Sequence, residues 1–336
     1  MIRRRAFTQT LAASALGCGT AVRAQEHAFP NRPIRLVVGL APGGIADITA
    51  RMIAPRLGEL LGQNVVVENR TGAGGAIATR MVATSAPDGY TLLAAFDGTH
   101  VTIPAANTAA GFDPVGDFAP IGKIVDSPVL VTTHPSFPAR DFGEFITLSR
   151  QQLTAGGASR TFDYGTSGIG STGHLTMELL KLRLGFYALH IPYRGGGDAR
   201  AQLLGRQIPM MLAAVPTTSN DIRAGLLKGL AVTSAQRSPV LPNVPTLAEL
   251  NIPETRGLNI NSWVGMVAPA RTPAAIVARL DAALRQTLAT DEVRTRLLNS
   301  GASVVKSSPE LFGSQIAADF NQWKQVVHES RIRLEA

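Results

Sequence analysis

Cysteine is almost absent from this 336-residue sequence, and the only one, Cys18, lies near the start. The first 24 residues combine the arginines Arg3–Arg5, the short apolar segment Phe7–Leu16 and the small residues Val22 and Ala24. This order is typical of a secretory signal peptide, which predicts cleavage before Gln25 and export by the general or the twin-arginine route. The mature chain would then hold no cysteine, which excludes disulfides and thiol chemistry and leaves its stability to the core.

Other features are missing as well. Beyond the signal, no apolar run approaches the roughly 20 residues that cross a bilayer. Aromatic residues make up 5% of the chain, and no Lys/Arg cluster is interleaved with them. Four arginines and no acid leave with the signal, so the net charge of +8 falls to +4. Nucleic acid is therefore not expected as a partner. The six histidines lack metal-ligand spacing, so neither a metal nor a cofactor is expected.

What is present is an alternation of strand-like and helical segments, which predicts an α/β fold with a mostly parallel sheet. Pro55 falls inside a predicted helix, where it should cause a kink unless packing compensates. Capping patterns mark helix starts at Thr246, Thr272 and Ser308, and Gly301 marks a helix end. The predicted strands are Ile34–Leu40, Val65–Glu68, Thr91–Phe96, Val129–Thr132, Thr161–Tyr164, Ala188–Pro192 and Leu230–Thr233, and the helices between them are Asp47–Leu61, Ala76–Ala83, Asp141–Ser149, His174–Leu184 and Asp198–Leu204.

Two glycine loops repeat one pattern, one in each half of the chain. "VVGLAPGGIAD" and "DYGTSGIGSTGH" both run from a strand through a glycine loop into a helix start. A helix N-terminus presents unpaired N–H groups and the positive end of a dipole, so each loop is suited to an anion. A third loop, Gly72–Gly75, also joins a strand to a helix and should lie at the same sheet edge.

The loop Gly168–Gly173 has the spacing G-x-G-x-x-G of a dinucleotide site. The next strand ends in Tyr193 and Arg194 where a ribose-binding acid would be required, so dinucleotide binding, a general anion loop and a purely structural turn all stay open. Asp47 could stabilise its helix or organise the binding loop. His174 could be a helix-end residue or a ligand contact, and His190 is expected in the core.

Several stretches together resemble the extracytoplasmic receptors of tripartite tricarboxylate transporters, the Bug family. They include "VENRTGAGG" with "PDGYTLL", "DYGTSGIGSTGHLTMELLK", "IPYRGGGDARAQLLGRQI" and "SPVLPNVPTLAE", and they extend in order from Phe29 to about Val327. The resemblance implies a type II periplasmic-binding-protein fold: two α/β domains, 25–125 with 257–336 and 126–256, joined by crossing strands around a central cleft. It implies a periplasmic, monomeric, non-enzymatic receptor that passes a small mono- or dicarboxylic acid to membrane permease subunits.

The same resemblance supplies the expected ligand-binding residues. One group comes from the first loop and its neighbours: Gly43, Gly44, Ile45, Ala46, Asp47, Arg70, Ala73 and Gly74. The other comes from the second half: Ser167, Gly168, Gly170, Ser171, Thr172, His174, Tyr193 and Arg194.

This chain departs from the family pattern in two places. Ile45 and Ala46 replace small or hydroxyl residues of the first loop, and Met210 and Met211 stand where relatives carry acids. We interpret both as a less polar cleft wall, which favours a ligand with one carboxylate and an apolar or aromatic remainder. Two other functions stay open: a secreted hydrolase or NADP-linked enzyme that uses the Gly168–Gly173 loop, and a receptor that reports to a signalling partner.

Overall fold

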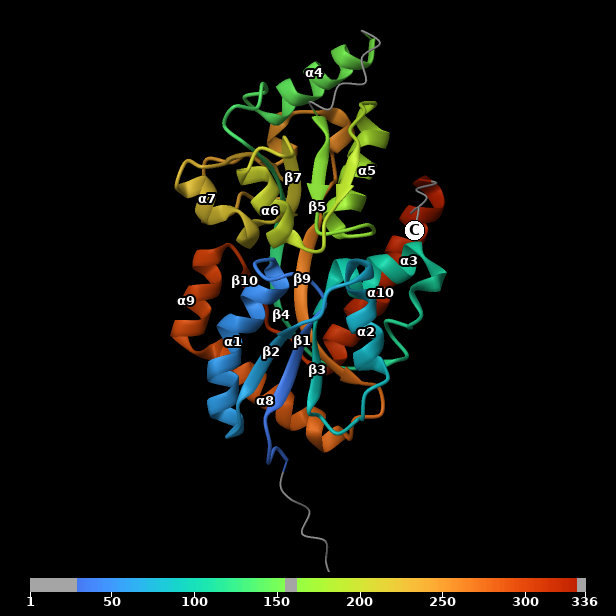
Figure 1. Cartoon of the computed structure of the whole chain (residues 1–336), viewed down its shortest axis with the longest axis vertical. Coiled ribbons are helices and arrows are strands. Elements are labelled where there is room, and N and C mark those ends of the chain that lie inside the picture. Colours follow the sequence, from blue (N-terminus) through green and yellow to red (C-terminus); the bar gives the residue numbers. More distant parts are fainter. Residues whose placement is uncertain (1–28, 155–161, 331–336) are drawn as a thin grey trace, which may run out of the picture.

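The computed structural model describes residues 29–154 and 162–330, and the predicted signal peptide lies outside them. Figure 1 shows two α/β lobes stacked along the long axis of the molecule, with strands running between them. The first lobe contains the strands β1 (Ile34–Val38), β2 (Val65–Asn69), β3 (Thr91–Phe96), β9 (Asn261–Pro269) and β10 (Ser303–Val304), and the helices α1 (Ile45–Leu61), α2 (Ala76–Ala83), α3 (Ile103–Ala106), α8 (Ala274–Ala289), α9 (Asp291–Ser300) and α10 (Pro309–Ser330).

The second lobe is built from the middle of the chain. Its elements are α4 (Phe142–Thr154), β5 (Tyr164–Thr166), α5 (Thr172–Leu184), β6 (His190–Pro192), α6 (Gly196–Leu204), β7 (Met210–Ala214), α7 (Ser219–Arg223) and β8 (Lys228–Val232). In each lobe a group of parallel strands, β2-β1-β3 and β6-β5-β7, has helices on its faces. This arrangement is the predicted α/β fold.

One long strand joins the two lobes. β4 (Phe118–Thr133) pairs antiparallel with β9 over its first part and with β7 and β8 over residues 129–133. The strand order is therefore continuous, β2-β1-β3-β9-β4-β7-β5-β6. The expected crossing strands are present. The exact residue limits of the two domains stay a prediction, with β4 passing through the boundary at 125/126.

Each lobe has its own apolar core, because its helices bury one face against the sheet. In the first lobe, side chains of α1, α8 and α9 pack on β1, β3, β4 and β9, with Ile53, Leu57 and Leu284 fully or almost fully buried. In the second, Phe142, Phe145 and Tyr164 lie at the centre of a separate cluster. These two cores fix the loops that face one another between the lobes.

Most predicted elements are found within a few residues of their expected bounds, with some differences. β4 is much longer than predicted, and β7 and β9 were not predicted. β5 begins only at Tyr164, while Thr161 of the predicted strand lies outside the described residues. Helix α1 continues through Pro55. Long-range pairing explains the differences, because β4 and β9 are stabilised mainly by each other.

The predicted caps can be checked atom by atom. Thr246 and Glu249 form the reciprocal capping box, and Ser308 Oγ accepts the Leu311 N–H. Gly301 ends α9 in the left-handed conformation at φ 96°. The prediction for Thr272 is wrong: its hydroxyl donates to the Pro269 carbonyl and does not cap α8.

Candidate functional site

A cavity of about 680 Å³ opens between the lobes, where the parallel strands of both lobes end. The first lobe contributes the turn after β2 and the region of α3, and the second contributes the turns after β5 and β6 and the start of α6. The carboxyl edge of parallel strands is where α/β proteins usually bind ligands. The lining residues are Gly72, Ala73, Gly74, Ile103, Asn107, Gly168, Ile169, Pro192, Tyr193, Arg194, Asp198, Ala201 and Gln202.

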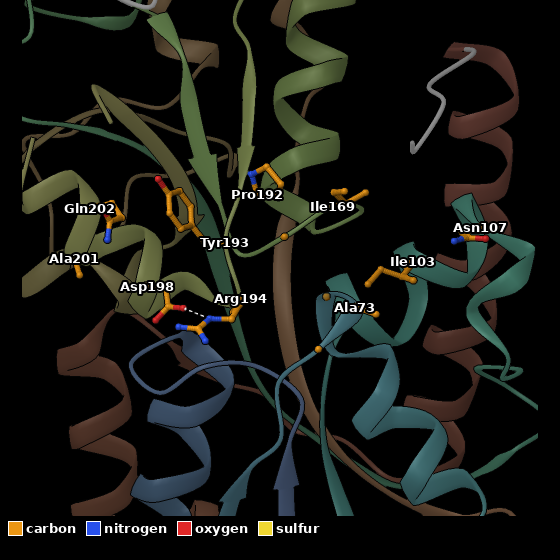
Figure 2. A pocket seen from close by; sticks show the side chains of 13 residues that line it. Ala73, Ile103, Asn107, Ile169, Pro192, Tyr193, Arg194, Asp198, Ala201 and Gln202 are labelled. Atoms are coloured by element: carbon orange, nitrogen blue, oxygen red, sulfur yellow. Dashed lines mark hydrogen bonds and ion pairs between the residues drawn. The ribbon is translucent and has the colours of Figure 1, made fainter. Parts of the chain in front are cut away.

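The lining combines one ion pair with a largely apolar wall. Arg194 Nε lies 3.1 Å from Asp198 Oδ2, with 79% of the arginine side chain exposed (Figure 2). Ile103 from the first lobe and Ile169 and Tyr193 from the second supply apolar surface. A guanidinium has five N–H donors, so Arg194 can hold Asp198 and still bind a ligand carboxylate. The cavity therefore offers a site for one carboxylate beside an apolar surface.

The first glycine loop is held in shape by Asp47, which is only 4% exposed. Its carboxylate accepts hydrogen bonds from Gly43 N (3.0 Å), Arg51 Nε (2.9 Å) and Asn69 Nδ2 (2.9 Å). The same asparagine also donates to the Leu40 carbonyl. Both interpretations of Asp47 hold at once, because this first-turn acid of α1 also organises the loop. The Gly43 N–H is already paired here.

The second glycine loop carries a similar internal network. Ser171 caps α5 by accepting the His174 N–H, and His174 Nδ1 in turn accepts the Gly170 N–H at 3.1 Å. Thr172 donates to Asp97 Oδ2 of the first lobe at 2.6 Å. His174 is thus a helix-end residue that organises the loop, and its ring stacks on His190 with centroids 3.8 Å apart.

Burial sets the protonation of these groups. It lowers the pKa of His174 to about 4 and that of His190 to about 3, where the neighbouring His174 also contributes. A neutral His174 can accept the Gly170 N–H, which a protonated ring cannot do. Burial also raises the pKa of Asp97 to about 7. Burial is the largest cause of the shift in all three groups.

Each glycine loop meets a different segment of the opposite lobe. Methyl groups placed on Gly43 and Gly44 would contact Gly197 and Gly196, so the first loop lies against the start of α6. The second loop lies against the third: a methyl group on Gly168 would be 3.4 Å from Gly74 Cα. The two glycine loops of the internal repeat therefore have different partners across the cleft.

The expected site residues divide into two groups. Ala73, Gly74, Gly168, Tyr193 and Arg194 line the cavity, while the following do not: Gly43, Gly44, Ile45, Ala46, Asp47, Arg70, Ser167, Gly170, Ser171, Thr172 and His174. Arg70 instead pairs with Glu68 at 2.6 Å. Within this second group, Gly43, Gly44 and Thr172 meet the opposite lobe.

Both residue pairs that we interpreted as an apolar cleft wall are elsewhere. Ile45 and Ala46 are 4% and 2% exposed and belong to the core under α1. Met210 and Met211 are fully buried on the two faces of β7, in two different core clusters. The interpretation was therefore wrong for these residues, and Ile103, Ile169 and Tyr193 supply the apolar wall.

Sequence reasoning missed several lining residues. Ile169 and Pro192 adjoin predicted residues, and Asp198 and Gln202 follow Arg194 by one and two helical turns, so spacing could have suggested them. Ile103 and Asn107 have no such signal, because only the lobe-to-lobe packing brings α3 to the cavity.

Other kinds of site find no support. Among residues 29–154 and 162–330, no three His, Cys, Asp or Glu side chains gather so as to hold a metal ion. Within the same ranges, no helix is both long and apolar enough to cross a membrane. His190 contacts Thr166 Oγ1 and the ring of Tyr164, so it is hydrogen-bonded as expected, but it is half-buried and lies at the edge of the core.

Comparison with known proteins places this geometry in context. The sequence profile described as "Tripartite tricarboxylate transporter family receptor" matches residues 49–332. Protein BugT of Bordetella pertussis is 33% identical over 318 residues, covering 94% of this chain and 95% of BugT.

Two solved structures are similarly close. MatC (Rpa3494) from Rhodopseudomonas palustris, with bound malate, has 32% identity and a TM-score of 0.83, covering 89% of this chain and 100% of its own. Rpa4515 of R. palustris, with adipate, has 33% identity and a TM-score of 0.84, covering 91% and 99%. The expected periplasmic-binding-protein fold is thereby confirmed.

Proposed function

Because the chain belongs to the family of tripartite tricarboxylate transporter receptors, we propose that it is a periplasmic receptor for a small organic acid, exported by its predicted signal peptide. The acid binds between the lobes and is passed to membrane permease subunits. The receptor acts as a monomer and does not transform its ligand. Two relatives of similar length hold malate and adipate, and both ligands are carboxylates.

The observation that carries this proposal is the interlobe cavity with Arg194 at its wall. Closing two lobes over a small acid removes it from water, which strengthens each charge-assisted hydrogen bond to its carboxylate. Glycine turns bring main chain close to the cavity at Gly74 and Gly168. The sequence-predicted residues Ala73, Tyr193 and Arg194 contribute side chains to the same wall.

We further propose that the ligand has one carboxylate and an apolar or aromatic remainder. Arg194 is the single cationic side chain that lines the described cavity, and Asp198 already neutralises it. A compact dicarboxylate would bring two negative charges to a pair that is neutral overall. An apolar remainder would instead bury surface against Ile103, Ile169 and Tyr193, at about 25 cal/mol per Å².

A thermal-shift panel of benzoate, hexanoate, adipate, malate and citrate tests this assignment. A ligand present at 100 times its Kd adds about 2.7 kcal/mol of stability, which is a readily measured shift. Benzoate or hexanoate should raise the midpoint most, and Arg194→Gln should remove the effect. Arg140→Gln is the matched control, because Arg140 is an exposed arginine of the same lobe, paired with Glu144. A response confined to the acids with two or three carboxylates, adipate, malate and citrate, would contradict the monocarboxylate proposal.

The remaining alternatives have direct tests. An enzyme would convert its ligand, whereas a receptor returns the same acid, so mass spectrometry of ligand released from denatured protein separates the two. Co-purification with permease subunits, or with a sensor protein, distinguishes transport from signalling. Conversion of the acid by purified protein would overturn the receptor assignment.

A further inference from the structure

The first glycine loop meets the start of α6 main chain to main chain across the two lobes. The Ala41 N–H of the first loop donates to the Arg194 carbonyl of the second lobe at 3.0 Å. A methyl group placed on Gly195 would lie 2.7 Å from Ala41 N, and one on Gly197 would lie 1.9 Å from Pro42 O. Side chains are thus excluded from this contact, which we call the glycine seat (Ala41–Gly44 against Gly195–Gly197).

The space at Gly197 is limited by the opposite lobe alone. Gly197 is the second residue of α6 and does not have a positive φ. The nearest atoms to an added methyl group are Pro42 O, Pro42 C and Gly43 Cα, all in the first lobe. Alanine is the better helix former by about 1 kcal/mol, so glycine at this position weakens its own helix. The fold of the second lobe gives no reason for glycine here, but the contact between lobes does.

We propose that the glycine seat determines closure of the receptor, and that Gly197 is a positioning residue for ligand retention. Any side chain at this position collides with the Pro42 carbonyl when the lobes are closed and has room when they are apart. The proposal rests on the receptor function proposed above, since closure holds the acid between the lobes.

The consequence for binding is specific. An acid can still enter an open Gly197→Ala variant and contact one lobe, so the association rate should stay within about twofold. The bound acid is no longer enclosed, so dissociation should be about 10- to 100-fold faster, as expected for an overpacked contact that disfavours the closed state. A merely structural role of Gly197 would lower the thermal midpoint of the ligand-free protein, which closure control leaves unchanged or raises.

Gly205→Ala is the matched control, because Gly205 follows the end of the same helix at φ −77°, and the atoms nearest to an added methyl group all belong to its own lobe, with Ala201 O the nearest at 3.3 Å. Distances between spin labels on Ile77→Cys in α2 and Leu182→Cys in α5, both exposed positions, report the separation of the lobes. The mature chain has no native cysteine that would take up label.

Measurements are made without ligand and with benzoate or adipate. We expect the short, closed distance in the Gly205→Ala background and its loss in the Gly197→Ala background, with both variants folded. An equal closed population in both backgrounds, or its loss in both, would overturn the proposal. If neither acid changes the distances or binds, the carboxylate assignment fails. The ligand-free distances still test the seat, because the two lobes are in contact there in the structure.

Discussion

Asp47 gives the sharpest test of how the first glycine loop is built. Asp47→Ala removes the acceptor of the Gly43 N–H and of the Asn69 amide, both partly buried. Leaving a buried donor unpaired costs about 1–3 kcal/mol. The bond to Arg51 adds little, because 52% of that side chain is exposed. The expected loss is therefore about 2–4 kcal/mol of unfolding free energy.

The geometry makes a second prediction for Asp47→Asn. Oδ2 accepts from Gly43 while Oδ1 accepts from Arg51 and Asn69. Either orientation of an asparagine amide turns its NH₂ group toward a donor, so asparagine should restore little of the loss. If only the size and shape of the Asp47 side chain mattered, Asp47→Asn would retain almost the full stability of the wild type.

Urea unfolding followed by tryptophan fluorescence is a suitable assay, because both tryptophans, Trp263 in β9 and Trp323 in α10, lie in the first lobe. Glu59→Ala is the control: it removes the same charge from the same helix, but Glu59 is 64% exposed and pairs only with Arg56. Its effect should stay within about 0.5 kcal/mol. If Asp47→Ala lost no more than this control, the loop-organising role of Asp47 would be refuted.

Three further predictions concern pH and capping. His174 and His190 have pKa values of about 4 and 3 in the folded protein, against 6.5 when unfolded. Their contribution to stability should therefore be full above pH 6.5 and fall as the pH drops toward 4. The variant with asparagine at both positions should show a flatter dependence of the urea midpoint on pH between pH 7 and 5. The pH dependence from Asp97 has the opposite sign, because its pKa is about 7 in the folded protein against 3.8 when unfolded. Its contribution to the free energy of unfolding falls as the pH rises from 4 to 7, so Asp97→Asn should become more stable relative to wild type across that range. Thr246→Ala should cost about 1 kcal/mol of unfolding free energy by removing the hydroxyl that accepts the Glu249 N–H, and far-UV circular dichroism in urea measures it, because Thr246 lies in the second lobe.

Local sequence signals predicted most of the parallel strands, with β7 the exception, together with the glycine turns and most caps. Leu36, Val37 and Val38 are consecutive apolar residues and all fully buried, as expected for a strand covered on both faces. The length of β4 was not predictable: residues 129–132 were expected as a strand, but the first part of β4 is stabilised by β9, which lies some 130 to 150 residues away. Pairing over that separation leaves no local pattern.

Only part of the site was predicted, because the rest also depends on packing between distant segments. Glycine turns identify which loops approach the cleft, and Gly74, Gly168 and Arg194 do line the cavity. They do not indicate which side of a helix start faces the core. Ile45 and Ala46 begin α1 with their side chains against the sheet, which depends on the angle at which that helix packs. The partner of each loop likewise depends on how the two lobes close.

Strand β4 limits how this protein can be altered by insertion or deletion. Residues alternate between the two faces of a strand, and β4 belongs to both sheets, from Phe118 to Thr133. Deleting one residue near Pro128 would turn every later side chain to the other face, so Val129 and Val131 would leave the second core while the first lobe stayed intact. A second lobe transplanted from a relative would therefore have to join β4 in the same phase, whatever the sequence of its own loops.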